Sequence, residues 1–261
     1  MDLKELAVNE EKHIQKNHPW EYARARVINN LLKHIIKNDN SIHCAVDVGC
    51  GDIFFLNRYC GWHKNTFPIA VDTAFSDEII DNLTKRHNDI HLKCYKDIKE
   101  VNLNGEKASI VFLMDVIEHI ENDTWFLSLL SQCDFIDVNT IFVITVPAFN
   151  NLFCSHDKWL GHYRRYSQKD LQLCIKKAGL QNITDGYFFT SLLLPRLIQK
   201  TIEKSSKKQN AANGIGGWTR SKVTSWFYKS FLLADYYFFH FFRLLGIKVP
   251  GLSTYSICKL Q

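Results

Sequence analysis

The sequence lacks the features that mark several common protein classes. It holds no uninterrupted run of about 18 apolar residues, the length that a membrane-spanning helix needs. The first twenty residues carry charges such as Lys4, Glu5 and Glu10 where a secretory signal would have an apolar stretch. Internal repeats are absent as well. We therefore expect a cytoplasmic chain that does not span a membrane.

The eight cysteines also lack the spacing of a metal or redox motif. No two lie closer than six positions apart, so no Cys-x-x-Cys pair is available to bind zinc or to form a redox dithiol. We interpret them as reduced thiols of a cytoplasmic protein.

Acidic residues are scarce in the last part of the chain. Residues 187–261 contain eleven Lys or Arg, two acidic residues and 15 of the 34 aromatic residues, whereas the net charge of the whole chain is +5. With 261 residues, of which 46% are hydrophobic, the chain can bury one sizeable core, which excludes a disordered or fibrous protein. The change of composition near residue 187 indicates a different role for the segment that follows.

Runs rich in β-branched residues alternate with helical patterns along most of the chain. An amphipathic helix over residues 20–37 comes first. The alternation predicts an α/β protein with a Rossmann-like, doubly wound, mostly parallel seven-stranded sheet. The strands are expected at 43–48, 67–72, 90–95, 109–114, 140–146, 182–189 and 252–260, and the helices between them at 53–60, 76–87, 121–133 and 167–178.

We expect a single domain over residues 1–261. Its parts are an N-terminal helical segment (1–41), a ligand-binding core (42–189), a basic, aromatic helical insertion (190–250) and the last strand (251–261). Ligands of open parallel sheets bind beyond the carboxyl ends of the strands, so the loops that leave the first four strands are the ones to inspect.

The loop after the first strand favours a cationic ligand. The sequence Val46-Asp47-Val48-Gly49-Cys50-Gly51 forms a tight glycine turn into a helix. A dinucleotide fingerprint would need Gly or Ala at position 54, where this chain has Phe54. The carboxylates of Asp47 and Asp52 would repel a pyrophosphate, whereas they suit the sulfonium and ammonium groups of S-adenosylmethionine.

These residues resemble the class I S-adenosylmethionine-dependent methyltransferase family over residues 42–189 and 252–260, in particular bacterial members of surface-glycan or lipid-linked pathways. The turn resembles the family's acidic-x-Gly-x-Gly loop, although Ile53 stands where a third glycine is usual. The resemblance implies S-adenosylmethionine as cofactor and these binding residues: Asp47, Gly49 and Gly51 around the methionine part, Asp72 and Thr73 at the ribose, Asp97 and Ile98 at the adenine, and Asp115 and Val116 along the cofactor.

Methyl transfer to a hydroxyl requires an aligned acceptor and a group that takes the proton. His119 follows the fourth strand and is a candidate base, with a role in opening the next helix as the alternative. A second cluster, residues 155–166, follows the fifth strand, and a similar His-Asp then Gly-His-x-Arg-Arg-Tyr stretch recurs in the bacterial relatives. From it we predict catalytic roles for His156, His162 and Tyr163 and acceptor binding by Trp159, Arg164 and Arg165.

Two alternatives remain open for these segments. Arg164, Arg165 and Tyr166 can instead tie the loop to Asp170 and the following helix. A metal site is the other alternative: on a helix, Asp115, Glu118 and His119 would share a face, and His156 or His162 could complete a site for Mg²⁺ or Zn²⁺. Because Met114 and Asp115 continue a strand pattern, we expect no metal.

The basic, aromatic insertion has three open roles. Residues 218–246 are apolar on almost every side if helical, with Arg220, Lys222, Lys229, Arg243 and Lys248 at the flanks. Such a segment suits peripheral membrane contact, a cover over the active site, or packing in a homodimer. No nucleic-acid-binding module is recognisable, so we expect no nucleic acid partner.

The sequence thus predicts a methyltransferase that acts on an oxygen atom of a small acceptor. The acceptor is expected to be anionic, phosphorylated or of glycan type and to bind under the 155–166 loop. If the acceptor is lipid-linked, the enzyme is expected at the inner face of a membrane. Three alternatives stay open. They are methylation of nitrogen, methylation of a phosphate-type group, and a non-catalytic binding subunit that docks on a membrane or a partner.

Overall fold

The computed structural model describes residues 18–36, 41–205 and 221–261. The parts of the predicted N-terminal segment at 1–17 and 37–40, and the part of the insertion at 206–220, which includes Arg220, lie outside the described residues. All eight cysteines fall within the described ranges, and all are unpaired.

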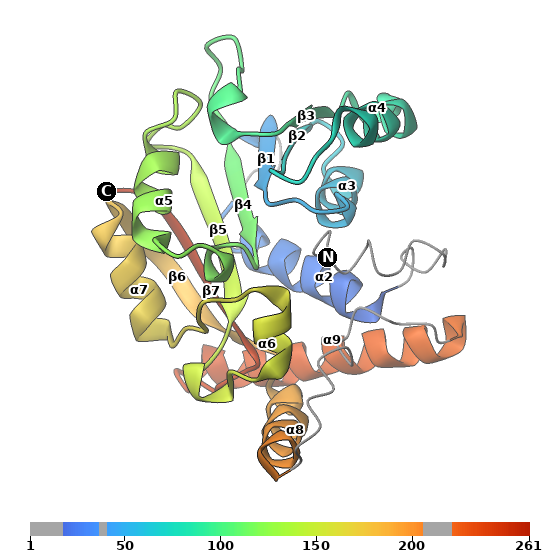
Figure 1. Ribbon diagram of the computed structural model, residues 1–261, viewed down its shortest axis with the longest axis vertical. Coiled ribbons are helices and arrows are strands. Elements are labelled where there is room, and N and C mark those ends of the chain that lie inside the picture. Colours follow the sequence, from blue (N-terminus) through green and yellow to red (C-terminus); the bar gives the residue numbers. More distant parts are fainter. Residues whose placement is uncertain (1–17, 37–40, 206–220) are drawn as a thin grey trace.

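A seven-stranded sheet forms the centre of the molecule, with strand order β3-β2-β1-β4-β5-β7-β6 (Figure 1). All neighbouring strands are parallel except β7, which runs antiparallel to β5 and β6. The strand order reverses between β1 and β4, so the predicted doubly wound sheet is confirmed. The strands are β1 Cys44–Val48, β2 Phe67–Val71, β3 Lys93–Tyr95, β4 Ile110–Met114, β5 Ile141–Pro147, β6 Leu180–Phe188 and β7 Ser253–Leu260.

Helices cover both faces of the sheet because its buried strands are apolar on both sides. The α-helices are α2 Pro19–Lys33, α3 Phe54–Trp62, α4 Asp77–Arg86, α5 Asp123–Ser131, α6 Ser155–Leu160, α7 Gln168–Lys177, α8 Leu193–Ser205 and α9 Lys222–Leu244. Short 3₁₀ helices are η3 Asn88–Ile90, η4 Ile98–Glu100, η5 Ile117–His119, η6 Asn150–Leu152 and η7 Thr190–Leu192.

Two apolar clusters hold the helices to the sheet. On one face Phe112 of β4 packs in a cluster with residues of α2, α3 and α9. On the other face Val111 and Leu113, its neighbours on the same strand, pack in a cluster with residues of α5 and α7. The alternation follows from the two-residue period of a strand.

The N-terminal helix and the insertion meet on the first of these faces. Helix α9 runs beside α2 (Figure 1), and the side-chain amide of Asn30 donates to the hydroxyl of Tyr237 at 2.6 Å. Helices α8 and α9 precede the last strand in the chain, in the place predicted for a helical insertion.

The structure corrects the sequence-based prediction at several element ends. The first helix ends at Lys33 instead of residue 37, and the third strand starts at Lys93 instead of residue 90. The strand is shortened because residues 88–90 form a 3₁₀ turn and His91 then takes a left-handed φ of 53°. The segment Ser155–Leu160, expected as loop, is helix α6.

Candidate active site

A cavity of about 950 Å³ opens at the carboxyl ends of the parallel strands, where the strand order reverses. The loops after β1, β2, β3 and β4 line one part of it. Residues of α6, of the loop that follows it and of α8 line another, and α2 contributes Trp20, Glu21 and Arg24. Twelve of the predicted site residues line this single cavity: Gly49, Gly51, Asp72, Thr73, Asp97, Ile98, Asp115, Val116, His119, His156, His162 and Arg165.

The turn after β1 packs so tightly that it requires glycine. Gly49 has a φ of +70°, and a Cβ atom there would lie 2.7 Å from Cγ2 of Val116. The amide of Gly49 donates to the carbonyl of Val71 at 2.7 Å, which holds the turn against the end of β2. The backbone of the turn therefore lines the cavity without a side chain in the way.

Asp72, at the end of β2, is held by two loops. Its Oδ2 accepts from the amide of Gly51 at 2.9 Å, and its Oδ1 accepts from the amide of Ala74 at 2.9 Å. One backbone bond to each oxygen fixes the carboxylate while leaving each oxygen able to accept another hydrogen bond.

The predicted adenine residues lie after β3. Asp97 caps η4 by accepting from the amide of Lys99 at 2.9 Å, and it is exposed. Ile98 is buried and lines the cavity beside it. Their location in the same cavity as Asp72 fits the predicted roles.

Asp47 lies deeper than its neighbours in the motif. It is a β1 residue, 1% exposed, and does not line the cavity. Within the described part of the chain its Oδ1 has no hydrogen-bond partner. Burial raises the pKa of Asp47 to about 8. It is thus a buried carboxyl below the glycine turn, not a group on the cavity surface.

Asp115 follows β4 and is bound from two sides. Its φ of 60° is left-handed, and Thr145 donates from Oγ1 to Oδ1 at 3.1 Å. Arg24 of α2 donates to Oδ2 and also to Glu21 at 2.6 Å. Although burial alone would raise it, the Arg24 guanidinium lowers the pKa of Glu21 to about 2. Helix α2 is therefore tied to the cavity wall through a buried ionic group.

Glu21 and Arg24 were missed as site residues. The signal was present, since both fall on the face of α2 that carries the buried Ile28 and Leu31 at helical spacing. Charged residues on the apolar face of a helix indicate a buried pair.

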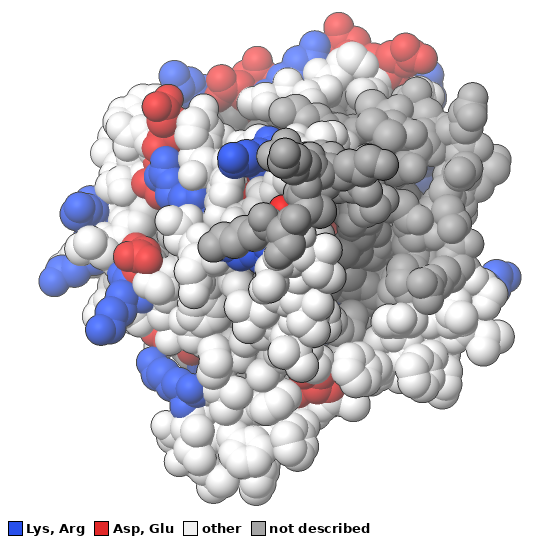
Figure 2. Space-filling view, turned by 60° about the horizontal axis from the view of Figure 1, so that its bottom comes forward, with Lys and Arg blue, Asp and Glu red and all other residues white. Residues whose placement is uncertain are grey.

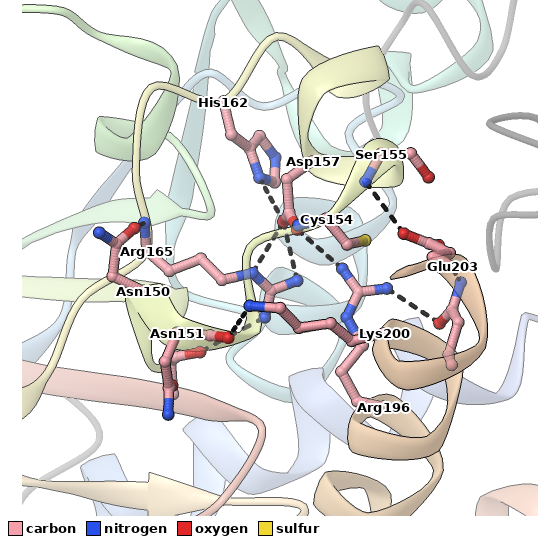
Figure 3. A network of polar contacts seen from close by, with 12 residues as sticks. Asn150, Asn151, Cys154, Ser155, Asp157, His162, Arg165, Arg196, Lys200 and Glu203 are labelled. Carbon is pink, nitrogen blue, oxygen red and sulfur yellow. Dashed lines mark hydrogen bonds and ion pairs between the residues drawn. The ribbon is translucent and has the colours of Figure 1, made fainter. Parts of the chain in front are cut away.

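Asp157 organises the opposite part of the cavity (Figure 3). It is fully buried and accepts from Nδ1 of His162 at 3.1 Å, from Nε of Arg165 at 2.8 Å and from Nη2 of Arg196 at 2.8 Å. Although burial alone would raise it, these three donors hold the pKa of Asp157 well below its usual range. Because the carboxylate only accepts, Nδ1 of His162 carries the proton.

Glu118 differs from Asp157 in its surroundings. It is 0% exposed and lines the cavity, yet neither carboxylate oxygen has a hydrogen-bond partner among the described residues. Burial raises the pKa of Glu118 well above its ordinary value. The rings of His119 and His162 lie beside it, perpendicular to each other with centroids 4.5 Å apart.

Three other predicted residues do not line the cavity. Tyr163 is 54% exposed, and Trp159 stacks on His156 with ring centroids 5.8 Å apart. Arg164 donates to Asp123 at 2.8 Å and to the carbonyl of Glu121 at 2.6 Å. The cavity is therefore lined by Arg165 and not by Arg164.

The alternative interpretation predicted that side chains of this loop bind a neighbouring helix. They do so, but Arg164 and Tyr166 bind Asp123 and not the predicted Asp170. Tyr166 donates to Asp123 at 2.7 Å, as Arg164 does, so the loop is tied to the start of α5. Asp170 instead accepts from Ser167 in the cap of α7.

Comparison with known proteins gives the fold. No protein family profile and no curated protein sequence matches the chain. Coclaurine N-methyltransferase bound to N-methylheliamine and SAH aligns with 90% of this chain and 70% of its own, at 13% identity and a TM-score of 0.51. A putative sarcosine dimethylglycine methyltransferase from Galdieria sulphuraria aligns over 89% and 83%, at 9% identity and a TM-score of 0.52.

A third solved structure is phosphoethanolamine N-methyltransferase 2 from Haemonchus contortus, in complex with phosphomonomethylethanolamine and S-adenosylhomocysteine. It aligns over 84% of this chain and 49% of its own, at 15% identity and a TM-score of 0.52. These similarities, together with the strand order, establish that this chain has the Rossmann-like fold of class I S-adenosylmethionine-dependent methyltransferases.

Proposed function

We propose that the protein is an S-adenosylmethionine-dependent methyltransferase. The observation that carries the proposal is the meeting of a glycine turn with the carboxylates of Asp72, Asp97 and Asp115 in one cavity at the point where strand order reverses. A negatively charged wall suits a ligand with sulfonium and ammonium groups. When bound, S-adenosylmethionine supplies an electrophilic methyl group, which an acceptor attacks in line.

The residues around the turn fit this cofactor. The two oxygens of Asp72 are oriented by Gly51 and Ala74 and can each accept from one ribose hydroxyl. The cavity of about 950 Å³ lies at the upper end of the range for ligand sites, which leaves room for an acceptor beside the cofactor.

We further propose that the acceptor is anionic. Arg165 and Arg196 line the cavity and surround a single carboxylate, that of Asp157, together with His162. In the described part of the chain, Nε of Arg196 and Nε of Arg24 are buried without a hydrogen-bond acceptor, and both residues line the cavity. An oxyanion of the acceptor, such as a phosphate or carboxylate, would accept from these donors.

His156 is our candidate for the base that takes the acceptor's proton. It lines the cavity, and its ring is held in place by stacking on Trp159. An imidazole titrates near neutral pH and is suited to deprotonating a hydroxyl during transfer. This supports methylation of oxygen, with nitrogen as the alternative acceptor atom.

We also propose that the acceptor is lipid-linked and is reached at the inner face of a membrane. One side of α8 lines the cavity through Pro195 and Arg196, while Leu194, Leu197 and Ile198 of the same helix are 65%, 46% and 52% exposed. An amphiphile could therefore place its anionic head in the cavity and its apolar chain along α8.

The apolar surface continues onto α9. Its side chains include Trp226, Phe227, Phe238, Phe241 and Leu244, each at least 59% exposed. Among the described residues on the face seen in Figure 2, uncharged ones predominate, and many of the charged ones lie toward its edges. No helix in the described ranges is long and apolar enough to cross a membrane.

Transfer of an isotopically labelled methyl group tests the function. The protein is incubated with methyl-labelled S-adenosylmethionine and either a total lipid extract or an aqueous metabolite extract of cells. We expect label in an anionic product of the lipid extract, and mass spectrometry then identifies the methylated atom. Label only in aqueous products would contradict the lipid-linked acceptor, and cofactor binding with no transfer in either extract would favour a non-catalytic subunit.

A further inference from the structure

We propose that Glu118, His119 and His162 bind a divalent transition-metal ion in the cavity. One ligand atom from each of these side chains lies within 4.8 Å of the other two. A point therefore exists at most about 2.8 Å from all three atoms (4.8 Å divided by √3), so bond lengths of about 2.0–2.2 Å need shifts below 1 Å. Side-chain rotation alone covers such shifts.

The charge of the site calls for a cation. Glu21 and Asp115 share the guanidinium of Arg24, and Asp157 holds those of Arg165 and Arg196. Glu118 is as buried as Asp157 but, within the described residues, accepts no hydrogen bond at either oxygen. A buried carboxyl without a partner is costly, and a bound cation would remove that cost.

The surroundings of His162 prepare it as a ligand. Its Nδ1–H donates to Asp157, so the lone pair lies on Nε2. In many metal sites a carboxylate accepts a hydrogen bond from the ring nitrogen that does not bind the metal, which fixes the orientation of the imidazole. The two arginines that hold Asp157 keep it ionised and fixed, so it acts as a positioning residue for this ligand.

The ligand set determines the class of ion. Two imidazoles and one carboxylate suit Zn²⁺, Fe²⁺ or Co²⁺, whereas Mg²⁺ and Ca²⁺ prefer oxygen ligands throughout. Three protein ligands leave coordination positions open to the cavity that all three residues line. The metal-site alternative from the sequence includes Asp115 as a ligand, but in the structure the carboxylate of Asp115 is hydrogen-bonded to Arg24 and Thr145.

A use in catalysis rests on the proposed function, whereas the binding of the ion does not. An ion at this position would bind the acceptor oxygen and lower the pKa of its hydroxyl, which would leave His156 to accept the proton. The ion would be unchanged in the step: the O–H bond breaks and its proton passes to the imidazole of His156, while the oxygen forms a bond to the methyl carbon. The bond between that carbon and the sulfur of S-adenosylmethionine breaks, and S-adenosylhomocysteine is the leaving group.

Metal binding can be measured without any acceptor. Chelator-treated protein is titrated with Co²⁺, followed by its visible ligand-field absorption, and the bound metal is counted by equilibrium dialysis and elemental analysis. We expect one Co²⁺ per chain, displaced by Zn²⁺. Glu118→Gln, His119→Ala and His162→Ala should each weaken binding at least tenfold, while His156→Ala, a histidine of the same cavity, should bind as the wild type does.

Folding of each variant is checked by thermal unfolding, and any one folded variant of the three suffices. Equal Co²⁺ affinity in wild type and a folded Glu118→Gln or His119→Ala would overturn the proposal, as would the absence of bound metal. Calorimetry with S-adenosylhomocysteine on the same samples separates the two proposals, because a metal-free protein that still binds this compound refutes the metal site alone.

Discussion

The carboxyl group of Asp47 has an environment that makes stability depend on pH. Burial raises its pKa to about 8 in the folded protein, from an ordinary value of 3.8. Between these two values the folded state keeps a proton that the unfolded state has released. The free energy of unfolding therefore falls as pH rises through this window, by about 1.4 kcal/mol per pH unit for this group.

We predict that Asp47→Asn flattens the decline of stability between pH 5 and pH 8. The amide has no charged form, so its burial cost does not change with pH. Urea unfolding of both proteins at pH 5, 6, 7 and 8 measures the difference. Equal slopes for the variant and the wild type would show that Asp47 titrates normally in the folded state.

For single residues, the sequence could predict which positions belong to the site but not which side chains they contact. Gly49 was predictable because a tight turn between strand and helix favours glycine, and Asp72 because its position after the second strand resembles that of the family's ribose-binding carboxylate. The partner of Arg164 was not, because Asp123 lies 41 positions away and the choice between it and Asp170 depends on how α5 packs. That Glu118 has no hydrogen-bond partner among the residues the structure describes likewise depends on the whole fold.

Helix α2 is held to the sheet by a buried ionic group as well as by its apolar face. Arg24, 5% exposed, bridges Glu21 of its own helix and Asp115 after β4. We predict that Arg24→Met destabilises the protein by about 3 kcal/mol, because it leaves Glu21 as an unpaired buried charge.

Adding Glu21→Gln should recover part of that loss. The double variant no longer buries the Glu21 charge, so its unfolding midpoint in urea should exceed that of Arg24→Met alone. A double variant that is less stable than Arg24→Met would contradict a charge-based cost.

The exposed apolar residues of α8 and α9 predict binding to membranes. We expect the protein to float with vesicles that contain phosphatidylglycerol and to bind less to pure phosphatidylcholine, with binding reduced by salt. Phe227→Glu, at a residue 63% exposed on α9, should reduce flotation at least tenfold.

Val138→Glu provides the matched control. Val138 is 65% exposed in the loop between α5 and β5, so the variant makes the same change of charge away from α8 and α9. Equal flotation of the two variants would show that α9 does not contact the lipid.

Elements with a strong residue pattern were predictable from sequence, and short ones were not. The five parallel strands β1 to β5 follow from their β-branched runs, and α7 follows from its periodicity and the Ser167–Asp170 capping box. Helix α6 has six residues, too few for a helical period to show, and it lies in a segment of mixed polarity.

Across the whole molecule, the strand order joins residues that are distant in sequence. Because β1 lies between β2 and β4, the loops that carry Gly49, Asp72 and Asp115 meet at one edge of the sheet. The sequence predicted this edge of the site. It left open whether the insertion that contains α8 covers the active site, and it did not predict that α2 helps to complete the cavity. The docking of both helices depends on tertiary contacts such as Arg24 to Asp115 and Arg196 to Asp157.

The carboxylates of Asp72, Asp97 and Asp115 at this edge are the feature from which the proposed function follows. Binding of S-adenosylmethionine by calorimetry to the wild type, Asp72→Asn and Asp81→Asn tests it most directly. Asp81 is a surface acid of α4, 73% exposed at its side chain, and controls for the loss of one charge. We predict binding to the wild type and Asp81→Asn, and an affinity at least tenfold lower for Asp72→Asn, as expected for the loss of about 1.4 kcal/mol or more from a charged hydrogen bond. No heat of binding with the wild type, or equal affinity in all three proteins, would contradict the account.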